Sequence, residues 1–237
     1  MTKRTLLTAT CLIALLPFSV QSEPKAGAYL AARQAAMNND FETGARFFTQ
    51  SLTADPLNPY LLENALVSYL GLGDFERATP IAKMMVETGI QSQVAHLTLS
   101  ADAAARDDWD TVTAGIEAGQ EIGPLVDGLS LAWAQVGKGQ MSDAIGAFDA
   151  VIAGAGLTAY GLYNKALALA HVGDFEGAEA IFAGIPSNGM RYNRRSAIAH
   201  AQILSQLGRN ADATLLLDEV FGAQTDPTLV TMRAAFA

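Results

Sequence analysis

Residues 71–78 read Gly-Leu-Gly-Asp-Phe-Glu-Arg-Ala, the pattern of a helix end, a tight turn and a helix start. Gly73 can take the left-handed backbone angles that close a helix, because it has no Cβ. Asp74 can cap the next helix by accepting a hydrogen bond from a backbone N–H of its first turn. Glu76 then lies at the positive end of the helix dipole. The stretch therefore predicts two helices joined by a tight turn.

The same phrase returns at residues 173–178 as Gly-Asp-Phe-Glu-Gly-Ala. Looser copies of it begin at Asn39, Asp107, Gly139 and Gly208. With Gly73 and Gly173, the six turn starts are separated by 34, 34, 32, 34 and 35 residues. A fixed period near 34 residues in a helical sequence indicates an array of helix–turn–helix repeats.

A pair of positions recurs after each turn start. Five residues on there is a small or modest side chain: Gly44, Ala78, Val112, Ala144, Ala178 and Ala213. Four residues further there is usually a bulkier one: Phe48, Ile116, Phe148, Phe182 and Leu217, with Ala82 as the exception. Residues four apart lie on one face of a helix. We expect the small residue to let two helices approach closely and the large one to fill the groove between them.

Taken together, these features resemble the tetratricopeptide repeat family. The resemblance covers about Lys25 to Phe221, and rests on the small–large pairs and the Gly-Asp-aromatic turns at Gly73 and Gly173. Two Asp-Pro steps, at residues 55–56 and 226–227, match the residues that close a unit in the family. The chain departs from the family pattern at interior-type positions and in lacking the closing Pro of three units. The interior departures are Val112, Lys165 and His200.

The resemblance implies an all-α fold, a right-handed superhelical solenoid of about six helix–turn–helix repeats and roughly twelve helices, without a sheet. The expected domain is 23–227, with units at about 25–58, 59–92, 93–124, 125–158, 159–193 and 194–227. Pro80 lies inside a helix and should bend it slightly. Residues 228–237 resemble the start of a further helix, with Leu229, Met232 and Phe236 apolar. We expect this end either to be truncated or to self-associate with another subunit.

The first 22 residues have the pattern of a signal peptide. Lys3 and Arg4 precede an apolar run of 13 residues from Leu6 to Phe18, which is short for a membrane span. We predict cleavage after Ser22 and export, and the family resemblance favours the periplasm of a Gram-negative bacterium. An uncleaved membrane anchor is the alternative. The single cysteine, Cys11, would leave with this segment, so the mature chain would have no disulfide.

Charge and composition restrict the class of partner. The mature chain would hold 13 basic and 24 acidic residues, a formal charge of −11. An acidic surface argues against binding to nucleic acid, whose phosphates require basic side chains. No stretch of the mature chain approaches the length of apolar sequence that spans a membrane, so no transmembrane span is expected there.

The array offers no catalytic, cofactor or metal site that sequence alone can define. His96, His171 and His200 fall in three different units, whereas a metal needs converging ligands. The glycines near Gly71 and Gly139 are turn glycines without the preceding strand of a phosphate-binding loop. We therefore expect a protein that is not an enzyme and has no cofactor.

The family resemblance implies that the first helices of successive units line a concave groove. The matching positions there are mostly apolar and aromatic: Tyr29, Arg33, Leu129, Trp133, Tyr160, Tyr163 and Leu167. Such a groove suits an apolar peptide or an amphipathic helix. The alternative is that these side chains pack against their own neighbours. The Lys and Asn pattern with which some members of the family hold a C-terminal carboxylate is not matched.

A basic cluster, Arg191, Arg194 and Arg195 around Tyr192, lies at the far edge of the expected groove. It could anchor a carboxylate of a partner or an anionic lipid headgroup, or it could be a solvated loop between units. The sequence thus predicts a non-catalytic scaffold that binds a protein or peptide. The alternative is the N-terminal interaction module of a longer exported protein whose activity lies beyond residue 237.

Overall fold

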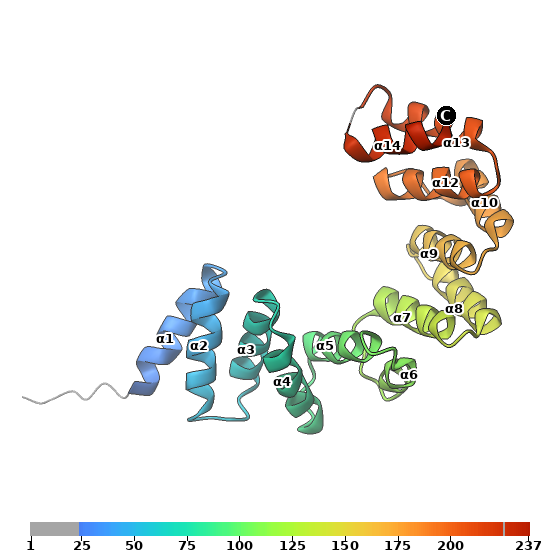
Figure 1. Ribbon diagram of the computed structural model, residues 1–237. Helices are drawn as coiled ribbons and strands as arrows, with labels where there is room; N and C mark the ends of the chain where they lie inside the picture. Colours follow the sequence, from blue (N-terminus) through green and yellow to red (C-terminus); the bar gives the residue numbers. More distant parts are fainter. Residues whose placement is uncertain (1–23, 225) are drawn as a thin grey trace, which may run out of the picture.

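The computed structural model describes residues 24–224 and 226–237, and that part of the chain contains fourteen helices and no strand (Figure 1). The expectation of an all-α helical repeat array is confirmed. The helices are α1 (Pro24–Met37), α2 (Phe41–Leu52), α3 (Pro59–Gly71), α4 (Phe75–Glu87), α5 (Gln93–Ala104), α6 (Trp109–Glu117), α7 (Pro124–Gly137), α8 (Met141–Ala153), α9 (Thr158–His171), α10 (Phe175–Ala183), α11 (Ile185–Asn188), α12 (Arg194–Gln206), α13 (Asn210–Phe221) and α14 (Pro227–Phe236). The expected signal peptide lies outside the described residues.

The turns have the chemistry that the sequence predicts. Gly73 has φ of 71° and Gly173 has φ of 87°, both in the left-handed region. The Asp74 side chain accepts a hydrogen bond from Arg77 N, and this bond, with that from the Arg77 side chain, lowers the pKa of Asp74. Asp40, Asp108 and Asp174 cap their helices in the same way. Gln140 and Arg209 make no side-chain cap, which shows that the turn tolerates the loss of this bond.

The small and large positions form the core as predicted. Ala78, Ala144, Ala178 and Ala213 are fully buried, as are Phe48, Phe148, Phe182 and Leu217. At Gly44 a Cβ would come within 2.7 Å of Ser68 Oγ, so a larger residue there would force the Ser68 hydroxyl to move. Ile116 of the divergent third unit is only partly buried.

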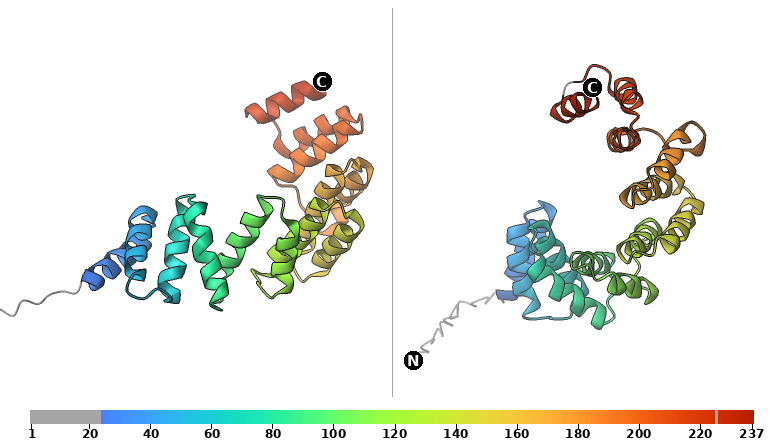
Figure 2. Two further views of the ribbon diagram at one scale, coloured as in Figure 1. Left: turned by 60° about the horizontal axis from the view of Figure 1, so that its bottom comes forward. Right: turned by 45° about the vertical axis from the view of Figure 1, so that its right-hand side comes forward.

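The helices stack in sequence order along a curved path, and each packs mainly on its chain neighbours (Figures 1 and 2). In the middle of the chain, α5, α7 and α9 lie on the inner side of the curve, whereas α6, α8 and α10 lie on the outer side (Figure 1). We use inner layer for the first helices of the pairs and outer layer for the second helices. No helix in the described residues is long and apolar enough to cross a membrane.

The fifth pair departs from the pattern. Helix α10 has only nine residues, and the short α11 follows it before a connecting segment, residues 189–193, which we call the strap. The three arginines of the basic cluster therefore do not all lie in one loop between units. Arg191 lies on the strap, whereas Arg194 and Arg195 form the first turn of α12.

Helix α14 packs on α13. Leu229 is fully buried and Met232 nearly so, in a cluster with Leu217 and Phe221 of α13. The Asp226 side chain caps this helix through the backbone N–H groups of Thr228 and Leu229. The apolar residues that the sequence indicates for this segment are thus covered by the preceding helices.

Candidate functional site

A hollow of about 390 Å³, which we call the tryptophan hollow, lies where inner-layer helices meet the outer-layer helix α6. Its walls come from α5, α6, α7 and one residue of α9. They are Ser100, Ala104, Trp109, Val112, Leu125, Val126, Leu129, Ser130, Trp133 and Asn164. Two of the predicted groove residues, Leu129 and Trp133, belong to this hollow. Its surface is mainly apolar, with a few hydroxyl and amide groups.

Trp133 is partly buried, and two neighbours hold its indole. Its Nε1–H donates a hydrogen bond of 2.9 Å to Asn164 Oδ1. Its ring packs edge-to-face on Phe148, with the centroids 5.8 Å apart. Trp133 therefore packs against its neighbours, as one of the two alternatives expects, and its exposed part forms a wall of the hollow.

Tyr160 and Tyr163 line a second hollow of about 320 Å³, which we call the tyrosine hollow. Its other walls are Ala159, Gly189, Met190, Arg191, Asn193 and Ser196. Tyr160 is 55% exposed, and Tyr163 packs edge-to-face on the buried Phe182. Asn164 lies between the two hollows, since its Nδ2 donates to the Tyr160 carbonyl oxygen over 2.9 Å. The predicted aromatic face thus comprises two separate hollows, whose walls are linked by the hydrogen bond from Asn164 to Tyr160.

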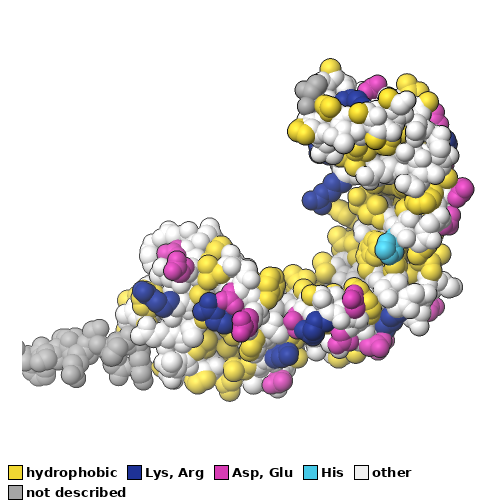
Figure 3. Space-filling view, viewed as in Figure 1, with side chains coloured by type: hydrophobic (Ala, Val, Ile, Leu, Met, Phe, Trp, Pro, Cys, Tyr) yellow, Lys and Arg dark blue, Asp and Glu magenta, His cyan; other side chains and the backbone are white. Residues whose placement is uncertain are grey.

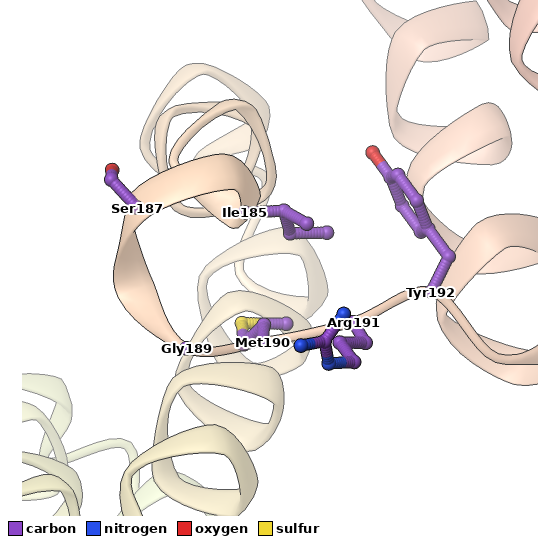
Figure 4. Close-up of a pocket in the computed structure, with 6 residues that line it drawn as sticks. All are labelled: Ile185, Ser187, Gly189, Met190, Arg191 and Tyr192. Atoms are coloured by element: carbon purple, nitrogen blue, oxygen red, sulfur yellow. The ribbon is translucent and has the colours of Figure 1, made fainter.

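A third hollow, of about 520 Å³, also lies along the strap (Figure 4). Figure 4 shows Ile185 and Tyr192 on either side of it, with Met190 and Arg191 on the strap and Ser187 pointing away. Arg191 lines both this hollow and the tyrosine hollow. It is exposed and makes no ion pair among the described residues.

Arg194 has a structural role. Its guanidinium donates two hydrogen bonds of 2.8 Å to the Asp226 carboxylate, and these bonds lower the pKa of Asp226. It also lies over the Phe221 ring, 5.8 Å from the centroid. Arg194 therefore ties α12 to the start of α14, whereas Arg195 is exposed and has no ion pair in the described chain.

The remaining predicted groove residues lie elsewhere. Tyr29 and Arg33 are on α1 at the opposite end of the array, where Tyr29 packs edge-to-face on Tyr60 and Arg33 lies 5.9 Å from the Tyr29 ring centroid. Leu167 is partly buried and lines neither hollow. The structure therefore brings together Leu129 and Trp133, and separately Tyr160 and Tyr163.

Sequence reasoning missed Trp109 and Asn164 as partners of this surface. Trp109 occupies the aromatic position of the third turn, so its place in the repeat indicates packing between helices. Asn164 is a polar residue in an apolar helix face, next to Tyr163, and such a residue commonly forms a hydrogen bond. This polar position in an apolar face is the feature of the sequence that could have indicated its role.

The histidines are used inside the fold. His96 Nδ1 lies 2.9 Å from the Glu121 carbonyl oxygen. His200 is stacked on Phe182 and shares a hydrogen bond of 2.7 Å with the Tyr192 hydroxyl. Burial lowers the pKa of His200. In residues 24–224 and 226–237, no three or more His, Cys, Asp or Glu side chains are placed so that they could hold a metal ion.

Comparison with protein-family models and with curated proteins finds no match. Comparison with solved structures finds tetratricopeptide repeat proteins. PilW, a widely conserved type IV pilus biogenesis factor, is 14% identical at a TM-score of 0.65, over 88% of this chain and 99% of that chain. A tetratricopeptide repeat protein from Parabacteroides merdae is 12% identical at a TM-score of 0.64, over 91% of this chain and 86% of that one.

YrrB, a tetratricopeptide repeat protein with an unusual peptide-binding site, is 14% identical at a TM-score of 0.50, over 79% of this chain and 97% of that one. Identities this low speak for the fold alone. Together with the repeated turns, the small–large pairs and the stacked helix pairs, they identify the chain as a solenoid with the tetratricopeptide repeat fold.

Proposed function

We propose that this protein is a non-catalytic scaffold that binds a segment of a partner protein along the inner layer of its curve. The tryptophan hollow carries the proposal, because an apolar surface built from successive repeats matches an extended or helical partner rather than a compact small molecule. The likeness to YrrB, a protein with a peptide-binding site, supports it. Aromatic side chains such as Trp109 and Trp133 are also the residues that most often dominate interfaces.

The proposal places the protein in the periplasm. The pattern of residues 1–22 supports export, and so does the likeness to PilW, a type IV pilus biogenesis factor. Mass spectrometry of the exported protein should find Glu23 at its N-terminus. An exported form that retains Met1 would contradict the cleavage.

The test of binding is a change at the rim of the tryptophan hollow that leaves the core intact. Val126 is 38% exposed there, so Val126→Lys should fold normally while placing a charge against the apolar wall. The probe is a peptide enriched on the purified protein from a random library displayed on phage. We expect Val126→Lys to weaken its binding about tenfold, the effect of roughly 1.4 kcal/mol.

Val172→Lys is the matched control. Val172 is 52% exposed at the C-terminal end of α9 and lines neither hollow. It should bind the peptide like the unchanged protein, and both variants should keep the same melting temperature. Equal loss of binding in the two variants, or none in Val126→Lys, would show that the tryptophan hollow is not the binding site.

A further inference from the structure

Charge is divided unequally between the two layers of the solenoid. The outer-layer helices α2, α4, α6, α8, α10 and α13 hold twelve acidic and three basic residues. The inner-layer helices α1, α3, α5, α7, α9, α12 and α14 hold three acidic and six basic residues. An acidic protein thus has an inner layer whose helices carry a net positive charge.

Helix formation alone does not require this division. Each outer-layer helix carries one acidic residue in its first turn, where the helix dipole favours it. The inner-layer helices have the same need at their N-termini, yet among them only α7 has an acidic residue in its first turn. Several of them begin with proline or an uncharged cap instead. The scarcity of acid on the inner layer therefore points to a role of the surface.

Two of the three acidic residues on the inner-layer helices already interact with other groups of the chain. Asp102 forms an ion pair with Arg106. Asp127 accepts hydrogen bonds from the backbone N–H groups of Ile122 and Gly123. This leaves Glu63, on α3, far along the array from the tyrosine hollow. Acidic residues are therefore few on the inner-layer helices, and none of them lines either hollow.

The basic residues differ in whether they are free to contact a partner. Lys165, Arg194 and Arg233 are paired with acidic residues of the chain itself. Arg191 and Arg195 are exposed and have no such pair among the described residues. Figure 3 shows a basic side chain projecting from the lobe of α12–α14 into the open side of the curve. Arg191 lines the tyrosine hollow together with Asn193, and Arg195 follows two residues later on α12.

We propose that the inner layer selects an acidic segment, with a bulky apolar side chain in the tryptophan hollow and one or more carboxylates beside Arg191 and Arg195. This inference rests on the proposed function and names the chemistry of the partner. A hydrogen bond from Asn164 of the tryptophan hollow to the Tyr160 carbonyl oxygen links the walls of the two hollows, so one short segment can reach both. An arginine fork hydrogen-bonds a carboxylate through two N–H groups, and Asn193 can donate a further one. A basic or neutral segment would lack this complementarity.

The experiment selects peptides from a random library on the purified protein and then measures one of them. The enriched peptides should share a bulky apolar residue and an excess of Asp and Glu. One labelled peptide is titrated against the unchanged protein and against Arg191→Ser/Arg195→Ser, at about 50 and about 300 mM salt. We expect the double variant to bind about tenfold more weakly at low salt, and its binding to depend less on salt.

Two controls fix the interpretation. Lys83→Ser removes a positive charge from α4 of the outer layer and should bind within about twofold of the unchanged protein. The same peptide with each carboxylate replaced by an amide should lose affinity for the unchanged protein and show little further loss with the double variant. All changed side chains are exposed, so the melting temperatures should agree.

The outcomes separate the two proposals. Enriched peptides without an acidic preference, or equal affinity for the double variant, would overturn the acidic partner while leaving the proposed function in place. If no peptide is enriched at all, the proposed function fails, and the inference fails with it.

Discussion

Individual residues on the inner layer combine structural and surface roles. Asn164 accepts the hydrogen bond from Trp133 and donates one to the backbone of Tyr160, so it links a wall of the tryptophan hollow to a wall of the tyrosine hollow. Trp133 packs on Phe148 while it lines the hollow. A change at either residue should therefore alter stability and binding together, which makes Val126 the better probe of binding alone.

His200 should make the stability of the protein depend on pH. Burial lowers its pKa in the folded state, so the unfolded chain takes up a proton at higher pH than the folded one. The free energy of unfolding should then decrease as the pH falls below about 6.5 and through the folded pKa. Glu179 and Arg209 form an ion pair with each other and have opposite effects on the pKa of His200: Glu179 raises it and Arg209 lowers it. Urea unfolding at several pH values measures the effect.

His200→Phe removes the titrating group and keeps a ring to stack on Phe182, so its stability should change less over the same pH range. His171→Phe, the same substitution at an exposed position, is the matched control. A variant at His200 with the full pH dependence of the unchanged protein would assign the effect to other groups.

Ala178 should not accept a larger side chain. It is fully buried in the cluster with Ala166 and Phe182, so Ala178→Leu should overpack the contact between helices and cost about 1–3 kcal/mol. Ala183→Leu, an exposed position on the same helix, should cost little. Equal denaturation midpoints for the two variants would place Ala178 outside the tight contact.

At the scale of the helices, local spacing predicted the regular parts of the fold. The turn phrase placed Gly73 and Asp74, and the four-residue spacing placed Ala178 and Phe182, because these depend on neighbours along one helix. Helix α11 and the strap were not predicted, since the fifth unit keeps a step near 34 residues although α10 ends early. The sequence period records the length of a unit and does not record where within it a helix ends.

Two glycines should respond to alanine in opposite directions. Gly173 has φ of 87° in the turn, so Gly173→Ala forces a left-handed backbone on a residue with a Cβ and should cost about 1 kcal/mol. Gly146 lies inside α8 with open space where a Cβ would go, so Gly146→Ala should stabilise by about 1 kcal/mol through helix propensity. Thermal or urea unfolding of the pair checks the signs, and the same sign in both would contradict the turn geometry.

At the scale of the whole molecule, the order of the helix pairs was predictable, whereas the composition of the inner surface was only partly so. Trp133 meets Asn164 across 31 residues of sequence, and Arg194 meets Asp226 across 32. The first contact joins one unit to the next, and the second joins α12 to the start of α14, so both depend on how far the inner-layer helices rotate. That rotation is set by packing between units, which the repeat pattern of a single chain does not specify.

Perturbing one end of the solenoid should leave the other end unchanged. Asp226→Ala removes both the cap of α14 and the partner of Arg194. Because helices contact mainly their chain neighbours, amide hydrogen exchange should become faster in α12–α14 and stay unchanged in α2–α5. Thr53→Ala, at the end of α2, is the reciprocal control and should affect the N-terminal helices alone. Faster exchange throughout the chain would show that the solenoid unfolds as one unit.

The same neighbour-only contacts give the curve a mechanical property. No pair of distant helices among the described residues makes the contacts that would lock its two ends at a fixed separation. The distance between the two ends of the curve can then change, because every junction between units contributes a small rotation. A partner that contacts both ends of the solenoid would fix the distance between them. The resulting strain would be distributed over all the junctions between units. Small-angle scattering of the protein with and without such a partner would record this as a change in end-to-end distance.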